Sequence, residues 1–188
     1  EQRHPDYICI AIAVLEGDGH VCKFIDGAAR DVSFAETKKI FKDFKPDMVA
    51  INATTPSIDS DLTYAKMCKE ELSGRVITVV IGAHASAEAE DTIKRAKGCL
   101  DAVARREYDW TLKDIASSNE FSSIKGISYS ENGNIISNPD RQFIQDLDKL
   151  PFPAWRHINP NDYYSPAKRN PFLTVITGRG CEGKCVFC

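Results

Sequence analysis

Short apolar runs alternate with amphipathic stretches between residues 20 and 118, and this alternation restricts the possible folds more than any other feature of the chain. Strands alternating with helices of this length form right-handed βαβ units around a parallel sheet. We therefore predict an α/β fold with a doubly wound, mostly parallel sheet. The predicted strands are residues 21–26, 47–53, 75–81 and 99–104, and the predicted helices are the stretch from Ser33 to Pro46 and residues 59–72, 86–96 and 109–117.

Two local signals support this prediction. Residues 75–81 are continuously apolar and rich in β-branched side chains, which is typical of a strand buried on both faces. We expect this strand to be central in the sheet or nearly so. Ser33 and Glu36 have the spacing of a capping box, in which each residue bonds the backbone of the other at the start of a helix.

Residues 7–15 fit two patterns. Ile8, Ile10, Ile12 and Val14 alternate with other residues, which by period favours a strand. Pro5 with Asp6 on one side, and the glycines at 17 and 19 on the other, resemble the start and stop of a helix. We favour the helix.

The pattern changes after residue 118. Residues 124–128 and 134–137 flank Asn132-Gly133, a dipeptide typical of a β-hairpin turn. Residues 138–171 hold six of the nine prolines together with several aromatic side chains, which favours an ordered connector packed on a neighbouring domain. A last apolar run at residues 172–177 resembles a strand and leads into GRGCEGKCVFC.

Charge and hydropathy exclude several classes of function. The net charge of −3 provides no basic field for nucleic acid or anionic lipid. No apolar run is long enough to span a bilayer, and residues 1–16 lack the features of a secretory signal. We expect a cytoplasmic protein without a transmembrane segment.

The seven cysteines fall into two groups. Cys9, Cys22, Cys68 and Cys99 are isolated in apolar or mixed segments, and we interpret them as buried, inert thiols. Cys181, Cys185 and Cys188 follow the spacing C-x3-C-x2-C in a glycine-rich segment. Three thiolates so close together suit an iron–sulfur cluster with one iron free of protein ligands, or a zinc site that needs a fourth ligand. His157 is the one upstream histidine placed for such a zinc site.

The cysteine motif resembles that of the radical S-adenosylmethionine superfamily: a strand ends in T-G-R-G-C, and an aromatic residue precedes the last cysteine. The resemblance implies a [4Fe–4S] cluster held by Cys181, Cys185 and Cys188, with Phe187 near the cofactor. In that family the open iron binds S-adenosylmethionine, and an electron from the cluster cleaves it to an adenosyl radical. The cofactors supply this chemistry, and the protein orients them.

The upstream region resembles the cobalamin-binding domain that precedes the radical domain in one branch of this superfamily. The similar segments are VLE at residues 14–16 through GHV at 19–21, ID at 25–26, IGAHA at 81–85, and the connector FIQDLDKLPFPAW at 143–155. The resemblance implies a Rossmann-like or flavodoxin-like domain with the corrinoid over the carboxyl ends of its strands. The cobalamin-binding residues that it implies are Thr54, Thr55, Ser57, Ser60, Gly82, Ala83, His84 and Glu107.

Three departures from the family pattern affect these expectations. The D-x-H-x-x-G motif is absent around His20, so that motif supplies no histidine ligand to cobalt. Arg106 stands where the family has a glycine. The family's central first strand precedes the first helix, whereas little precedes Pro5 here, so we expect a gap in the sheet.

The resemblance divides the chain into a cobalamin-binding-like domain at residues 1–120, a hairpin and connector at 121–171, and the start of a radical domain at 172–188. The chain begins with Glu1 and stops inside the cysteine motif, so we expect a piece of a longer enzyme that has no catalytic residue of its own and no turnover by itself.

The expected reaction is methyl transfer or ring formation on an unactivated carbon, with a small-molecule, lipid or tetrapyrrole-like substrate and a flavodoxin or ferredoxin as reductant. Two alternatives stay open. One is a stand-alone module that binds a corrinoid or nucleotide, and the other is a structural domain whose cysteines hold zinc.

Overall fold

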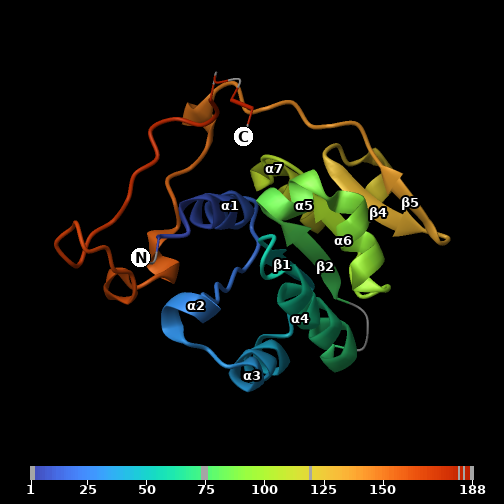
Figure 1. The fold of residues 1–188 in the computed structure, drawn as a ribbon, viewed down its shortest axis with the longest axis horizontal. Coiled ribbons are helices and arrows are strands. Elements are labelled where there is room, and N and C mark those ends of the chain that lie inside the picture. Colours follow the sequence, from blue (N-terminus) through green and yellow to red (C-terminus); the bar gives the residue numbers. More distant parts are fainter. Residues whose placement is uncertain (1–2, 73–75, 119, 182, 184, 187–188) are drawn as a thin grey trace.

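A mixed sheet forms the centre of the molecule (Figure 1). The computed structural model describes all residues except 1–2, 73–75, 119, 182, 184 and 187–188. Within the described part, the sheet has the strand order β1-β2-β3-β4-β5. The strands are β1 (Met48–Asn52), β2 (Ile77–Ile81), β3 (Ala102–Ala104), β4 (Ile127–Glu131) and β5 (Asn134–Ser137).

The first three strands are parallel, as the alternating sequence pattern predicts. Asn52 at the end of β1 pairs with Ile81 at the end of β2, and Val80 pairs with Val103 in β3. All but the first residue of β2 are buried, because the strand has a neighbour on each side and helices on both faces. This position inside the sheet confirms the expectation for residues 75–81 as far as they are described.

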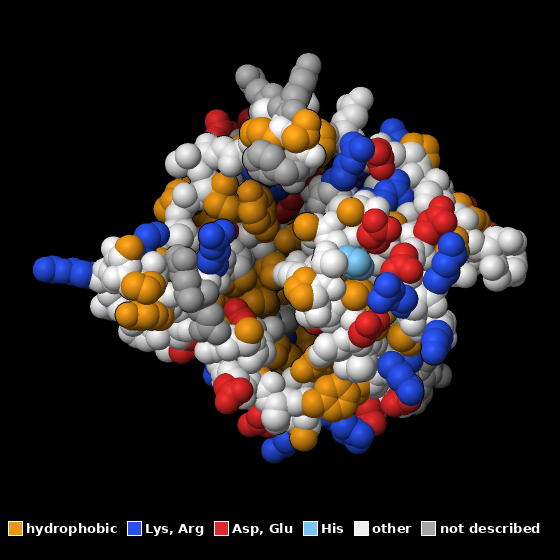
Figure 2. Space-filling model, viewed as in Figure 1, with side chains coloured by type: hydrophobic (Ala, Val, Ile, Leu, Met, Phe, Trp, Pro, Cys, Tyr) orange, Lys and Arg blue, Asp and Glu red, His pale blue; other side chains and the backbone are white. Residues whose placement is uncertain are grey.

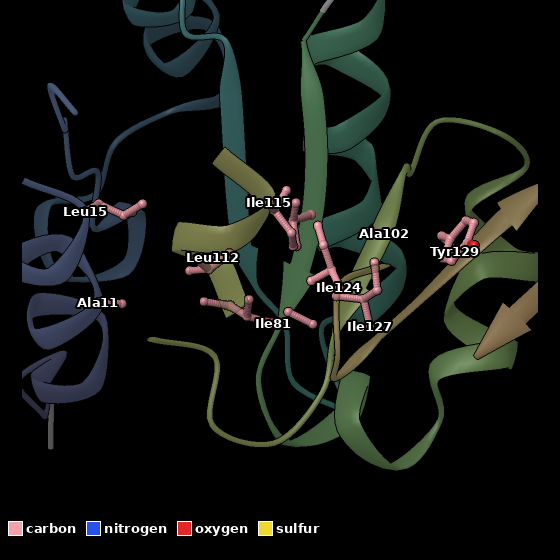
Figure 3. Close-up of a cluster of buried hydrophobic side chains, with 11 residues drawn as sticks. Ala11, Leu15, Ile81, Ala102, Leu112, Ile115, Ile124, Ile127 and Tyr129 are labelled. Atoms are coloured by element: carbon pink, nitrogen blue, oxygen red, sulfur yellow. The ribbon is translucent and has the colours of Figure 1, made fainter. Parts of the chain in front are cut away.

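Helices cover both faces of the sheet. On one face, α1 (Asp6–Gly17) and α7 (Asp109–Ser117) pack on the strands and share one apolar cluster with Ile81, in which Figure 3 shows α7 between α1 and the strands with Leu112 beside Ile81. On the other face, α4 (Ile58–Glu71), α5 (Ala83–Ala87) and α6 (Ala89–Ala96) pack around Val80 and Val103. Successive residues of β2 therefore face opposite layers, which is the doubly wound arrangement.

Residues 6–17 form a helix, as favoured, and the alternating isoleucines do not make a strand. Ile8, Ile10 and Ile12 follow a period of two, but the helix has few polar positions and is buried over most of its surface. Cys9 and Leu15 are within the buried set as well. A helix that packs on the sheet and is also covered by the connector needs apolar residues on more than one side.

Two local predictions are confirmed at the level of single hydrogen bonds. Ser33 and Glu36 form the capping box at the start of α3 (Phe34–Phe44), with side chain and backbone bonded in both directions. Asn132 and Gly133 both have positive φ, 51° and 81°, in the two-residue turn between β4 and β5. Such φ values match the right-handed twist of a hairpin.

The prediction of a strand at residues 21–26 is wrong for the described structure. A strand needs the backbone of a neighbour, and within the described residues β1 is the last strand on that side. Val21 is 82% exposed, whereas a short helix, α2 (Gly27–Arg30), follows Asp26. Figure 2 shows a hollow lined by hydrophobic side chains between the α1 side of the molecule and the β1 side. The five described strands are hydrogen-bonded in one continuous order, so no gap lies between them, and the strand that the family pattern places before the first helix stays a prediction.

Two further boundaries differ from the predictions. The helix predicted at residues 86–96 starts earlier and is broken in two, because Glu88 leaves helical geometry between α5 and α6. Residues 172–177 form no strand, since no described strand lies beside them to pair with.

The connector is ordered without regular strands, as its composition predicts. It leaves β5, passes over the top of the view in Figure 1 and reaches the far side of α1. There the Ala154 N–H donates to the Cys9 carbonyl at 2.9 Å, and Tyr163 is buried with its hydroxyl 2.9 Å from Asp26 Oδ2. Ala154 directly precedes the short turn η3 (Trp155–His157), and Tyr163 directly follows the short turn η4 (Pro160–Asp162).

Candidate cofactor site at the carboxyl edge of the sheet

Three segments that follow parallel strands meet at one edge of the sheet. They are residues 53–57 after β1, 82–86 after β2 and 105–108 after β3. The Ala53 N–H donates to the Ile81 carbonyl at 2.9 Å, and the Arg106 N–H donates to Ser86 Oγ at 2.7 Å. Hydrogen bonds thus join the first segment to the second and the second to the third. In open α/β sheets this edge is where ligands collect.

Gly82 lies at the closest approach of these segments. A Cβ on Gly82 would lie 2.6 Å from the Ala53 carbonyl oxygen and 2.8 Å from Asn52 Oδ1, and the φ of Gly82 is +109°. Both features exclude a side chain there. Packing within the chain is therefore enough to require this glycine, in addition to the cofactor contact that the sequence predicts.

His84 and Thr55, both predicted cobalamin-binding residues, lie against each other. The His84 Nδ1 atom is 3.2 Å from Thr55 Oγ1, although 29 positions separate the two residues. His84 is 7% exposed, and its Nε2 atom is buried without a hydrogen-bond partner in the described structure. A buried polar nitrogen without a partner is costly unless a ligand satisfies it. This atom fits a ligand with polar side groups, such as the amides around a corrin ring.

The remaining predicted residues of these segments are small or hydroxylic. Thr54 Oγ1 lies 2.7 Å from Ser57 Oγ, which in turn donates to Asp61 Oδ2 in α4. Ser60 is in the first turn of α4 instead of a loop, and Ala83 begins α5. Thr54, Thr55, Ser60 and Ala83 are exposed, so backbone and hydroxyl groups are open to a ligand at this edge.

Glu107, the last predicted contact, is engaged by the chain itself. Its Oε2 accepts a hydrogen bond from the Ile144 N–H at 2.7 Å, and its Oε1 is 3.4 Å from the Arg179 guanidinium. Arg179 also binds both oxygens of the buried Asp109. Sequence reasoning missed Arg179 and Asp109 as functional residues. The signal was present, since a charged residue inside T-G-R-G-C needs a partner if that segment packs on the domain.

Arg106 has the left-handed backbone of the glycine that it replaces. Its φ is +62°, a conformation in which glycine has no steric cost. Its side chain binds Asp140 at 2.7 Å and covers the ring of Phe143. The family glycine is therefore explained by the backbone, and the arginine adds contacts to the connector.

The part of the cysteine motif that the structure describes lies at the red end of the chain, above α1 and α7 in Figure 1. The sulfur atoms of Cys181 and Cys185 are 3.1 Å and 3.6 Å from the point that a Cβ on Gly183 would occupy, and the Gly183 N–H donates to Cys181 Sγ. The two thiols thus face one small space that only a glycine leaves open. Cys188 and Phe187 lie outside the described residues, and the described part contains no group of three metal-ligating side chains. Two converging thiols are donors of the kind that an iron–sulfur cluster requires.

His157 is engaged away from the cysteines. Its Nε2 atom is 2.8 Å from Glu16 Oε1 at the end of α1, and Arg156 binds the other oxygen of that carboxylate. The imidazole nitrogen therefore holds the connector on α1, and this contact gives the zinc alternative no support.

Of the four scattered cysteines, Cys9 and Cys68 are buried as predicted, whereas Cys22 and Cys99 are only partly buried. Burial raises the pKa of Cys9 to about 11, with Asp6 and Asp26 adding to the shift, and burial raises the pKa of Cys68 to about 12. Both are protonated at neutral pH, and a protonated thiol is a poor nucleophile and metal ligand.

Two clefts lie away from the three edge segments. One, of about 420 Å³, is lined by parts of α1, α7 and residues 148–151. The other, of about 400 Å³, lies between residues 23–32 and α3. None of the helices in the described ranges has the length and apolarity needed to cross a membrane.

Comparisons with known proteins identify the family of the chain. A family model described as the B12 binding domain matches residues 4–116. An uncharacterized methyltransferase of Pyrococcus horikoshii is 38% identical over 181 residues, which cover 94% of this chain and 39% of that protein. The anaerobic magnesium-protoporphyrin IX monomethyl ester cyclase of Rubrivivax gelatinosus is 24% identical over 194 residues, covering 98% of this chain and 34% of that protein. The chain thus spans about two fifths or less of the length of these relatives.

The fold has a solved counterpart. The radical S-adenosylmethionine methyltransferase TsrM from Kitasatospora setae, solved with cobalamin and a [4Fe–4S] cluster bound, aligns with a TM-score of 0.63 and 10% identity. The alignment covers 80% of this chain and 28% of that one. At this identity the similarity establishes the Rossmann-like fold and nothing finer.

Proposed function

The chain belongs to the B12-binding domain family, and we propose that it is the cobalamin-binding portion of a radical S-adenosylmethionine enzyme that transfers a methyl group or forms a ring. Its relatives include a methyltransferase and a cyclase, which supports this enzyme class. Bound cobalamin supplies a cobalt centre that can carry a methyl group, and the residues of this chain bind and orient it.

The observation that carries the proposal is the unpartnered Nε2 of His84 at the carboxyl edge, beside Thr55. We propose that cobalamin lies over this edge and takes hydrogen bonds from the hydroxyl and backbone groups there. The proposed contacts are Thr54, Thr55, Ser57, Ser60, Gly82, Ala83 and His84. Since no D-x-H-x-x-G motif is present, cobalt receives no histidine ligand from that source.

We propose that Cys181, Cys185 and Cys188 hold a [4Fe–4S] cluster whose open iron binds S-adenosylmethionine, with Phe187 beside that cofactor. The convergence of the Cys181 and Cys185 thiols on Gly183 supports this assignment. In this proposal, residues 1–120 form the domain that binds cobalamin, and residues 172–188 begin the radical domain. Residues 121–171 form the hairpin and the connector between the two domains.

The substrate class that we propose is a small molecule of lipid or tetrapyrrole type. The match to a magnesium-protoporphyrin ester cyclase over 98% of this chain supports the tetrapyrrole side of that choice. A flavodoxin or ferredoxin in the cytoplasm is the proposed source of electrons.

The test is anaerobic reconstitution followed by two separate measurements. Corrin absorbance should report cobalamin binding in the unchanged protein, and iron and sulfide analysis should report the cluster. Cys181→Ala and Cys185→Ala should each lose the cluster but keep cobalamin, because the edge segments are separate from the thiols. Cys99→Ala is the matched control and should keep both cofactors.

Cobalamin uptake without iron would support a stand-alone corrinoid module instead. Bound zinc in a colourless protein would support the structural alternative.

A further inference from the structure

The segment before the cysteine motif contacts the domain through apolar and polar side chains: Phe172 lies against the His4 ring, and Thr174 and Arg179 bind acidic residues. In residues 172–180, Val175 is 79% exposed and Leu173 is 44% exposed. The Arg179 side chain is only 8% exposed, although it is charged. A charged group is buried at such a place only where partners compensate it, so Arg179 needs an explanation.

Asp109, Glu107 and Tyr7 all contact the guanidinium group of Arg179. The two guanidinium nitrogens Nη1 and Nη2 donate to Asp109 Oδ2 at 2.6 Å and Oδ1 at 3.1 Å, a two-bonded fork. Nη1 is also 3.4 Å from Glu107 Oε1, and the guanidinium carbon lies 4.9 Å from the centre of the Tyr7 ring. Burial by itself lowers the pKa of Arg179, but its hydrogen bonds to Asp109 and Glu107 raise it above the usual value.

These partners belong to the edge that holds the candidate cofactor site. Glu107 lies in the segment after β3, and Asp109 is the first residue of α7. Tyr7 is in the first turn of α1, where the neighbouring Asp6 accepts a hydrogen bond from Thr174 at 2.6 Å. The segment is therefore tied to the starts of two helices on one face of the sheet.

The carboxylates of Asp109 and Glu107 require a cation beside them, because both are largely buried. Asp109 is 2% exposed, and Glu107 is largely covered. Two carboxylates this close repel each other in a protected site, and the amino end of α7 compensates only part of that charge. The domain thus presents a preformed acceptor for one guanidinium, and the residue that fills it stands two positions before Cys181.

We propose that Arg179 is the positioning residue that seats the cysteine motif on the segment after β3, and so sets where the cluster ligands lie relative to the cobalamin edge. The effect on the cluster ligands rests on the proposed function. The binding of Arg179 to Asp109 and Glu107 does not depend on it, because it is present in the chain without cofactors. A lysine cannot replace it fully, because an ammonium group lacks the planar fork that binds both oxygens of Asp109.

The first experiment measures limited proteolysis of the full chain without cofactors, with the cleavage sites located by mass spectrometry. Arg179→Gln should raise the rate of cleavage within residues 174–180 about tenfold or more, since the segment loses its buried anchor, while β2 stays uncleaved. Arg179→Lys should give a smaller increase. Arg95→Gln is the matched control, because Arg95 forms exposed ion pairs with Asp91 and Asp59, and it should leave residues 174–180 unchanged.

An unchanged rate of cleavage within residues 174–180 in Arg179→Gln would overturn the proposal. If Arg179→Gln is also cleaved in β2, its fold is damaged. In that case, Arg179→Lys decides, and an unchanged rate of cleavage within residues 174–180 in that variant would overturn the proposal. Glu107→Gln should affect the segment less than Asp109→Asn, because the Glu107 contact is longer.

The second experiment separates positioning from simple stability. In the loaded protein, the magnetic coupling between Co(II) in cobalamin and the reduced cluster should change in Arg179→Lys, while cobalamin and iron contents stay equal to those of the unchanged protein. Equal coupling would limit Arg179 to a local structural role and contradict the proposal. Failure of the unchanged protein to take up cobalamin or iron would contradict the proposed function alone, and the proteolysis data would still decide on Arg179.

Discussion

A Cβ on Gly82 would lie 2.6 Å from the carbonyl oxygen of Ala53, so the chain after β2 and the chain after β1 are in direct backbone contact at the candidate cofactor edge. The contact is set by the parallel register, in which Ile81 and Asn52 pair at the ends of their strands. The edge is thus shaped by the fold before any ligand binds.

The first prediction follows from this contact. Gly82→Ala should lower the free energy of unfolding by about 2–4 kcal/mol, because it adds a clash with Ala53 to the cost of a positive φ. Gly98→Ala is the matched control, since Gly98 has a φ of +87° but open space around it, and it should cost about 1 kcal/mol. Urea unfolding of both variants measures the difference. Equal losses would contradict the role of the Ala53 contact.

The second prediction concerns Arg106. Arg106→Gly and Arg106→Ala both remove the contacts with Asp140 and Phe143, so the comparison isolates the backbone at φ +62°. The glycine variant should be more stable than the alanine variant by about 1 kcal/mol. The same pair of substitutions at Arg95, inside α6, should show the reverse order, because glycine is unfavourable in a helix. Chemical denaturation gives both differences.

The third prediction is a pH dependence at Glu16. Burial alone raises the pKa of Glu16, but hydrogen bonds from His157 and Arg156 outweigh this, and the pKa in the folded protein is below its ordinary value of 4.5. A lowered pKa contributes stability that is present above the unfolded value and is lost as pH falls through the folded value.

The stability advantage of the unchanged protein over Glu16→Gln should therefore shrink as the pH is lowered below about 4.5. Urea unfolding at a series of pH values checks this. His157→Phe removes one partner and should weaken the same trend. An advantage that is constant with pH would show that the contact with Glu16 is absent in solution.

The fourth prediction tests the candidate cofactor contacts. His84→Ala should weaken cobalamin binding by about 1–2 kcal/mol, the value of one hydrogen bond, without abolishing it. Ser130→Ala is the control, because Ser130 is exposed near the end of β4, which runs antiparallel to β3 and away from the cofactor edge, and it should leave binding unchanged. Titration followed by corrin absorbance measures both. Complete loss in His84→Ala would mean that this histidine ligates cobalt, contrary to the hydrogen-bonding role.

Several features of this protein were predictable because they depend on neighbours in the sequence. The capping box of Ser33 and Glu36 and the turn at Asn132-Gly133 are completed within a few residues, so composition and spacing specify them. The α/β class follows from the repeating alternation of apolar runs and amphipathic stretches, since each unit carries the same signal. The cysteine spacing likewise depends only on neighbours in the sequence, and the ligand role that it indicates stays a prediction.

Other features depend on contacts between residues far apart in the sequence. Residues 21–26 have the pattern of a strand, but no described strand lies beside them, and a strand exists only with a partner. The sequence around Gly82 indicates only the end of a strand, yet a glycine is required there because Ala53, 29 positions earlier, leaves no room for a side chain. Arg179 and Asp109 are separated by 70 positions, and only packing makes them a buried pair. The sequence by itself determined the helix cap, the hairpin turn and the alternation of helices and strands, whereas the tertiary structure decided which apolar runs become strands and which residues meet, because burial and pairing depend on neighbours in space.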